Sequence, residues 1–139
     1  MTEVVVECAR EGPTFLPYGI EMDILHFQKL LADFATDRDW DQFHTPKNLS
    51  TAIVCEAGEL AEIFQWMSAE ESTRAMDDEA LAEAIRDELA DVQLYLLRLA
   101  DKLNVDLESA MQAKIQKNAL KYPVEVSRGS AEKYSRRKR

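Results

Sequence analysis

Four acidic residues form two pairs whose members stand three positions apart. Glu56 and Glu59 make the first pair, and Glu88 and Asp91 make the second. In an α-helix, residues at positions i and i+3 lie on the same face, so each helix would direct two carboxylates toward one point. Glu56 also takes a place in the apolar stripe of its segment where a leucine would be expected. The pattern predicts four carboxylates gathered between two helices.

Such a group of carboxylates requires a compensating positive charge. Two carboxylates about 4 Å apart repel by roughly 4 kcal/mol at an effective dielectric constant near 20, and burial adds a further cost of several kcal/mol for each. The four ligands are oxygen donors, with no cysteine or histidine among them. This donor set suits a hard divalent ion, so we expect Mg²⁺, with Mn²⁺ as the alternative. Because Mg²⁺ completes its shell with water and substrate phosphates, the site also predicts a phosphorylated substrate.

A solvated helix face is the alternative interpretation of acidic residues at this spacing. We apply it to the neighbouring acids Glu62, Glu83 and Asp87. A site is favoured for the two pairs because both lie at the edge of an apolar stripe, on two long helical segments.

Apolar residues recur with a helical period in four segments. We expect helices over about 21–36, 45–67, 77–103 and 106–122, with Thr45 as an N-cap, Pro46 as a first helical residue and Asp106 as the cap of the last. The residues between 68 and 76 are expected to form a loop. No segment alternates as a strand would, so the predicted fold class is all-α, a bundle of four helices.

The third helix is apolar on more than one side. Leu94 and Leu97 lie off its main stripe, which predicts a central helix or one buried against another subunit. Arg98 and Lys102 on the same helix fit ordinary surface bases. The main stripe consists of Leu81, Ile85, Leu89, Val92, Leu96, Leu99 and Leu103.

The length of the chain favours one domain, and its net charge disfavours nucleic acid as a partner. The chain has 139 residues and a formal net charge of −9, whereas binding to a phosphate backbone depends on clustered Lys and Arg. Six of the basic residues lie in the segment 128–139. We expect an irregular lead over 1–20, a helical domain over 21–125 and a basic tail over 126–139.

The two cysteines and the apolar segments bear on the compartment. Cys8 and Cys55 have no zinc-like or redox-like spacing, and Cys55 fits a reduced core thiol. No signal peptide is evident, and no apolar run approaches the roughly 18 residues that a membrane span needs. The expectation is a cytoplasmic protein that has no membrane partner.

Several separate motifs, in order along residues 21–134, resemble those of the MazG-like all-α NTP pyrophosphatases, and within them the dCTP pyrophosphatase branch. Two positions depart from the pattern, namely Cys55, where many members have a second Glu, and Leu31, where some have a histidine. The motifs are Arg38-Asp-Trp-Asp-Gln-Phe-His44, Glu56-Ala-Gly-Glu-Leu-Ala-Glu-Ile-Phe-Gln-Trp66, Asp87-Glu-Leu-Ala-Asp-Val-Gln-Leu-Tyr95, Lys121-Tyr-Pro-Val124 and Ser127-Arg-Gly-Ser130.

The resemblance implies roles for particular residues. The two acidic pairs would ligate Mg²⁺; apart from the resemblance, we expect one of these four carboxylates, Glu59 first, to orient the attacking water as well. A base and sugar pocket would be lined by Trp40, His44, Trp66 and Tyr95, and the phosphates would be contacted by Lys114, Asn118, Lys121 and Tyr122. The resemblance further implies a homotetramer, built as a dimer of dimers.

The aromatic residues have a physical case of their own. Trp66 is one helical turn past Ile63, and Tyr95 is one turn beyond Asp91. A flat ring beside a phosphate and metal site can stack a nucleobase, which contributes about 1–3 kcal/mol in nucleic-acid systems. Packing in a core is the alternative role for each ring.

Two function classes follow. The first is an Mg²⁺-dependent enzyme that cleaves a nucleoside triphosphate, dCTP or a modified dCTP, to the monophosphate and pyrophosphate in nucleotide-pool sanitation. The second is a non-catalytic helical metal-binding or interaction module that uses its apolar third helix. A di-iron bundle is disfavoured because that chemistry needs Glu-x-x-His on two helices, and neither His26 nor His44 fits.

Overall fold

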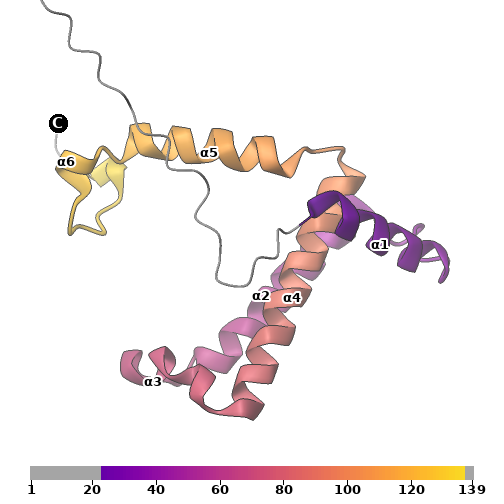
Figure 1. Cartoon of the computed structure of the whole chain (residues 1–139), viewed down its shortest axis with the longest axis horizontal. Coiled ribbons are helices and arrows are strands. Elements are labelled where there is room, and N and C mark those ends of the chain that lie inside the picture. The colour runs from indigo at the N-terminus through magenta and orange to yellow at the C-terminus, as the bar shows by residue number, and fades with distance from the viewer. Residues whose placement is uncertain (1–22, 137–139) are drawn as a thin grey trace, which may run out of the picture.

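The computed structural model describes residues 23–136. This part of the chain is helical and contains no strand (Figure 1), as the predicted all-α class requires. The elements in chain order are α1 (Ile24–Thr36), α2 (Pro46–Phe64), α3 (Ala69–Thr73), η1 (Ala75–Asp77), α4 (Glu79–Lys102), α5 (Leu107–Lys121), α6 (Val124–Ser127) and η2 (Tyr134–Arg136).

Side-chain caps set the start of each long helix. Asp23, Thr45, Asp78 and Asp106 each accept a hydrogen bond from the backbone N–H three residues on, at 3.0 to 3.2 Å. Such caps satisfy amide groups that have no partner inside the helix. Pro46 follows the second cap as the first helical residue, which costs nothing because its missing N–H would be unpaired there. Thr45 and Asp106 are thereby confirmed as the predicted caps of α2 and α5.

Helices α2 and α4 form the body of the molecule. They run antiparallel and side by side, joined at one end by α3 and η1 (Figure 1). Leu49 on α2 and Leu97 on α4 are the largest fully buried side chains. Helix α1 packs against the C-terminal half of α4, where the Gln28 amide donates to the Leu97 carbonyl oxygen at 3.2 Å.

Three local expectations need correction. The segment after α2 is not a simple loop, because Ser68 and Glu71 form a reciprocal capping box that starts α3. Helix α2 ends at Phe64, which leaves Trp66 in the turn beyond it. Cys55 is exposed rather than a core thiol.

The buried side of α4 also differs from the predicted stripe. Leu97 is 1% exposed although it lies off the stripe, whereas Leu89 and Leu103 within the stripe are 53% and 51% exposed. Among the described residues, only α1, α2 and η1 make extensive contacts with α4. No other described element therefore covers the remaining apolar side of α4.

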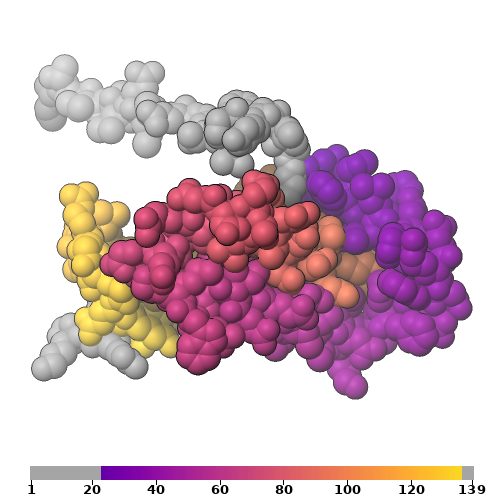
Figure 2. Space-filling view, turned by 90° about the horizontal axis from the view of Figure 1, so that it is seen from below, coloured from indigo at the N-terminus to yellow at the C-terminus, as the bar shows by residue number. Residues whose placement is uncertain are grey.

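Helix α5 leaves the end of α4 and extends away from the α2–α4 pair (Figure 1). None of its residues is buried. Seen from below, residues 124–136 lie on the opposite side of the molecule from α1 (Figure 2). Among the described helices, none is both long and apolar enough to cross a membrane.

The predicted domain limits fall partly outside the described residues. The lead over 1–20 and the last residues of the tail, 137–139, lie there. The boundary at 125 cuts through α6, and Tyr134 of the expected tail lies edge-on to the Tyr122 ring at 5.8 Å. The division into lead, domain and tail stays a prediction.

Candidate functional site

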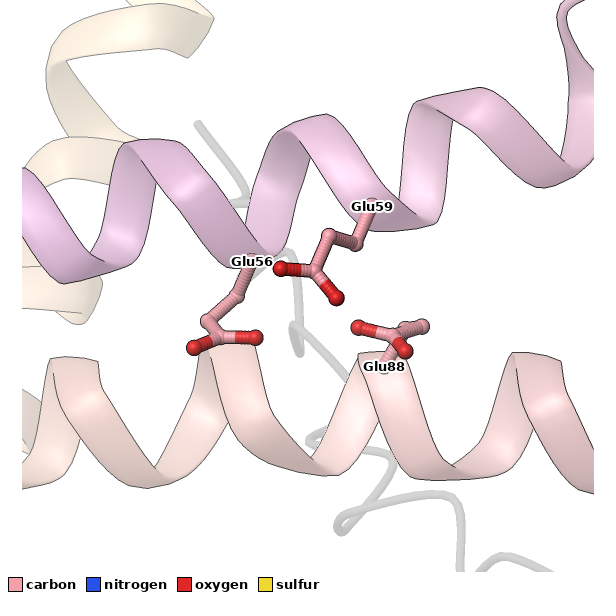
Figure 3. A group of neighbouring side chains, drawn as sticks. All are labelled: Glu56, Glu59 and Glu88. Carbon is pink, nitrogen blue, oxygen red and sulfur yellow. The ribbon is translucent and has the colours of Figure 1, made fainter.

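Three carboxylates meet between the two central helices. Glu56 and Glu59 come from α2, Glu88 comes from α4, and each offers an oxygen within 4.8 Å of the others. Figure 3 shows the three side chains pointing into the space between the helices. The face predicted from the i and i+3 spacing is therefore formed on α2, and it is opposed by α4.

The electrostatics of the group are unfavourable without a cation. Partial burial raises the pKa of Glu56 above its usual range, and the charges of Glu59 and Asp91 raise it further. Burial likewise raises the pKa of Glu88, with added repulsion first from Glu59 and then from Glu56, Asp91 and Asp87. Both causes disfavour the ionised form.

One oxygen of the group lacks a partner. Glu88 Oε2 is buried, and no group in the described part of the chain donates a hydrogen bond to it. A buried acceptor without a donor is costly. A hard divalent cation would satisfy this oxygen and offset the repulsion among the three acids. The donor set thus fits Mg²⁺ or Mn²⁺.

Asp91 lies one helical turn beyond Glu88 on α4. Its side chain is exposed and stands outside the group of three. Its charge nevertheless acts on the site, because it raises the pKa of both Glu56 and Glu88. The structure thus places Asp91 at the rim of the group as a candidate fourth ligand. Glu62, Glu83 and Asp87 are exposed, as expected of surface acids.

The raised pKa of Glu88 makes a prediction about the metal-free protein. The folded state binds this proton more tightly than the unfolded state, so the contribution of Glu88 to stability falls as pH rises from about 4.3 through its folded pKa. In EDTA, Glu88→Gln is expected to melt a few degrees above the wild type at pH 7, and the gap should close toward pH 4. Glu83→Gln on the same helix is the control. A Glu88→Gln variant that melts below the wild type at pH 7 would contradict this assignment.

Tyr95 continues the same stripe of α4, one turn past Asp91. Burial raises the pKa of its hydroxyl, and the charges of Glu56 and Asp91 add to the shift. The charges of two of the acids therefore act on the Tyr95 hydroxyl, and the place of this ring in a base pocket stays a prediction.

Trp40 and His44 lie in the connection between α1 and α2. The Trp40 ring meets Phe34 edge-on at 5.8 Å and His44 at 6.4 Å. His44 Nδ1 accepts a hydrogen bond from Arg98 of α4 at 3.2 Å. This hydrogen bond holds the paired rings of Trp40 and His44 against α4, one helical turn beyond Tyr95.

The other predicted pocket residues are not brought to the acids within one chain. Trp66 is 89% exposed, and Lys114 and Asn118 lie on the outlying helix α5. At the end of that helix, Lys121 and Tyr122 contact the ring of Tyr134. Because α5 leads away from the α2–α4 pair (Figure 1), Lys114 and Asn118 would need another subunit to meet the carboxylates.

The sequence interpretation missed Arg98. It was expected to be an ordinary surface base, but it is 4% exposed and is held by three side chains. Its burial could have been suspected from the sequence, because Arg98 follows Leu97 on a helix that is apolar on more than one side. The partners could not be read from the sequence because Asp41 and His44 are more than 50 residues away.

The described residues form helices and no strand, and three acidic side chains meet between two of these helices. These features define an all-α protein with a candidate metal centre. The MazG-like family model matches residues 51–136 of this chain. The chain therefore belongs to the MazG-like family.

Relatives with assigned names are similar over most of the chain. It is 49% identical to dCTP pyrophosphatase 1 of Mus musculus, covering 85% of this chain and 69% of that protein. With dCTP pyrophosphatase 1 of Rattus norvegicus it shares 47% identity, covering 93% and 75%. A crystal structure of a pyrophosphatase from Archaeoglobus fulgidus has a TM-score of 0.68 and 35% identity, covering 75% of this chain and 95% of that one.

These similarities confirm the predicted family and fold class. They also confirm the prediction of an enzyme of the nucleotide pyrophosphatase type, since the family and the named relatives agree in it.

Proposed function

We propose that this protein is an Mg²⁺-dependent nucleoside triphosphate pyrophosphohydrolase that converts dCTP, or a modified dCTP, to dCMP and pyrophosphate. The observation that carries the proposal is the group of three facing carboxylates with one unpartnered buried oxygen. The names of the relatives support the substrate. Removal of modified nucleotides from the cytoplasmic pool would be its role.

Separate groups of residues would bind the metal, the base and sugar, and the phosphates. Glu56, Glu59, Glu88 and Asp91 would hold the metal, which when bound would neutralise phosphate charge and activate phosphorus toward water. Glu59 is the exposed member of the group of three, so it is placed to orient an incoming water. Trp40, His44, Trp66 and Tyr95 would bind the base and sugar. Lys114, Asn118, Lys121 and Tyr122 would hold the phosphates.

The position of Tyr95 predicts which phosphorus is attacked. A base stacked on this ring lies one turn from Asp91, which brings the α-phosphate, the group nearest the sugar, to the acids. Hydrolysis in ¹⁸O-water is therefore expected to label the nucleoside monophosphate. Mass spectrometry of the products decides the point. Label in pyrophosphate or orthophosphate would mean that the substrate binds in the opposite direction.

Base selectivity is a second expectation. The aromatic set Trp40, His44, Trp66 and Tyr95 favours a pyrimidine deoxynucleotide, with dCTP and its 5-substituted forms at the top. We expect kcat/KM for dCTP to exceed that for the purine substrates by about tenfold or more. Measuring kcat/KM across the eight common NTPs and dNTPs tests this. A purine in first place would refute the pocket assignment.

The uncovered faces of α4 and α5 support a homotetramer built as a dimer of dimers. Leu89 on α4, with Ile115 and Leu120 on α5, are each more than half exposed in one chain, and such apolar faces mark interaction surfaces. The same faces would suit the second candidate, a non-catalytic interaction module. Metal-dependent release of pyrophosphate separates the two, because the module would show none.

A further inference from the structure

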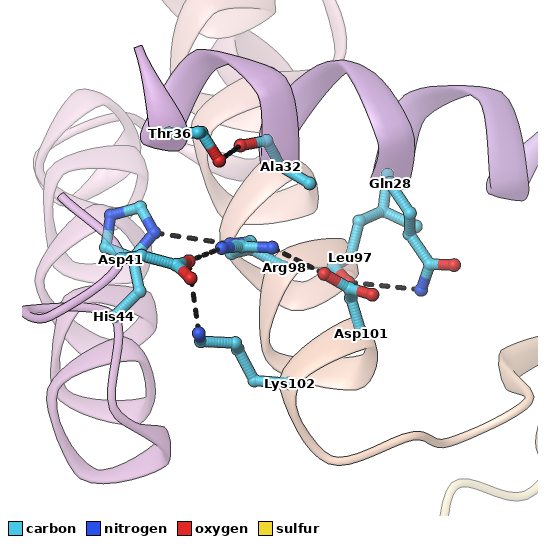
Figure 4. A network of polar contacts seen from close by, with 9 residues as sticks. All are labelled: Gln28, Ala32, Thr36, Asp41, His44, Leu97, Arg98, Asp101 and Lys102. Carbon is cyan, nitrogen blue, oxygen red and sulfur yellow. Dashed lines mark hydrogen bonds and ion pairs between the residues drawn. The ribbon is translucent and has the colours of Figure 1, made fainter. Parts of the chain in front are cut away.

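Arg98 is a buried cation near the C-terminal end of α4. Its guanidinium donates through Nη2 to Asp41, through Nη1 to Asp101 and through Nε to Nδ1 of His44 (Figure 4). Lys102 Nζ reaches the same oxygen of Asp41 at 3.1 Å. With all three of its nitrogens engaged and 4% of its surface exposed, Arg98 is placed to hold neighbouring residues rather than to contact a ligand.

The hydrogen bond to His44 fixes the protonation of the imidazole ring. A guanidinium stays protonated and can only donate, so Nδ1 of His44 must carry a free electron pair. The ring is then neutral, and its one proton sits on Nε2, the nitrogen directed away from Arg98 (Figure 4). In this tautomer Nε2 is a hydrogen-bond donor.

The surroundings of His44 support the neutral form. Burial lowers the pKa of the ring, and the positive charges of Arg98 and Lys102 lower it further, against an opposing effect of Asp41. These are the charged groups that act on the ring from the 37–45 connection and from α4. His44 therefore stays neutral at physiological pH.

The network adjoins the candidate site. On α4, Glu88, Asp91, Tyr95 and Arg98 follow one another at spacings of three or four, which places them on one face. Through Asp41 and His44, Arg98 joins this face to the 37–45 connection that carries Trp40. The acids and Tyr95 on α4 are thus linked through Arg98 to the connection that carries Trp40 and His44.

We propose that Arg98 is a specificity-positioning residue, which seals the 37–45 connection onto α4 and presents His44 as a neutral donor, through Nε2–H, to an acceptor of the nucleotide such as a carbonyl oxygen of the base. The proposal rests on the proposed function for the ligand. The tautomer of His44 rests on the structure alone.

The wild-type protein provides the first test without any substitution. The chain has two histidines, His26 and His44, and His26 lies on the exposed surface of α1. We expect ¹⁵N NMR of the imidazole rings to show His44 neutral at pH 7 with its proton on Nε2. A proton on Nδ1 of His44, or a positively charged His44 ring at pH 7, would overturn the proposal.

Arg98→Met is the second test, with Arg86→Met as its matched control. Arg86 pairs only with exposed Glu79 at 3.2 Å among the interactions of the described residues. Arg98→Met is expected to raise the pKa of His44 and to raise KM for dCTP about tenfold, with kcat within about twofold. Arg98→Lys, which keeps the charge but not the Nε–H donor, should leave KM for dCTP raised as in Arg98→Met. Full restoration of KM by Arg98→Lys, or an unchanged KM in Arg98→Met, would overturn the positioning role.

The proposed function and the proposed role of Arg98 would be refuted by different results. A wild type that shows the expected His44 tautomer but hydrolyses no nucleoside triphosphate would refute the proposed function, and with it the role of His44 toward a nucleotide. A wild type that hydrolyses dCTP while His44 carries its proton on Nδ1 would refute the Arg98 proposal alone.

Discussion

Glu56→Gln is expected to lower the turnover of nucleoside triphosphates by about a thousandfold or more, and Asp91→Asn is expected to do the same. Each change would replace a charged oxygen, proposed as a ligand of the metal, by a neutral amide, which binds a hard cation far more weakly. The measurement is kcat at saturating Mg²⁺ with a pyrophosphate readout. Near wild-type activity in either variant would refute its assignment as a ligand.

The same variants should gain stability when metal is absent. In the folded protein, burial and the charges of Glu59 and Asp91 raise the pKa of Glu56. Removing the charge of Glu56 or of Asp91 therefore relieves repulsion. We expect melting temperatures in EDTA at or above that of the wild type. Glu62→Gln, an exposed acid on α2, is the matched control and should change neither activity nor melting temperature. Lost activity together with a lowered melting temperature would indicate damage to the fold instead.

Local chemistry made much of this structure predictable. The caps Thr45, Asp78 and Asp106 act within three residues of themselves, so the sequence alone indicates where their helices start. The pairing of Glu56 with Glu59 is also local, because helical geometry sets it. The approach of Glu88 to that pair was predictable for a different reason, since an antiparallel pair of helices must bury its apolar stripes against each other.

Tertiary context decided the features that were missed. Helix α4 is apolar on more than one side, so periodicity could not select the side that α1 and α2 cover, and Leu97 is buried while Leu89 is not. The burial of Arg98 depends on Asp41 and His44, which arrive from another segment. The end of α2 before Trp66 depends on the competing capping box at Ser68.

The largest difference between the site expected from the sequence and the structure of one chain is the position of α5. Glu88 lies fourteen residues before the end of α4 at Lys102, which corresponds to about 21 Å at 1.5 Å per residue. Helix α5 begins beyond that end and leads away from the pair (Figure 1). Lys114 and Asn118 therefore cannot serve the carboxylates of their own chain, and α5 of a neighbouring subunit must supply them if they bind phosphate.

Assembly is accordingly expected to be a condition of activity. Light scattering of the wild type should give four times the mass of one chain. Ile115→Asp, which replaces a 68% exposed apolar side chain of α5 by a charged one, should produce smaller species. These species are expected to turn over dCTP at least about a hundredfold more slowly. Gln116→Asp adds the same charge on another face of the helix and should leave both mass and turnover unchanged. A wild type that is monomeric and active at micromolar concentration would refute the assembly.

Co-expression of two inactive variants tests whether α5 acts in a neighbouring subunit. Glu56→Gln removes a carboxylate but keeps α5 intact, and Lys114→Met does the reverse. In a mixed assembly, the carboxylates of the Lys114→Met chain would meet the intact α5 of the Glu56→Gln chain. Random association of equal amounts would then restore about a quarter of the sites, because the two correct halves must coincide. A site made within one chain would regain nothing from such mixing, since every chain would still lack one half of its machinery.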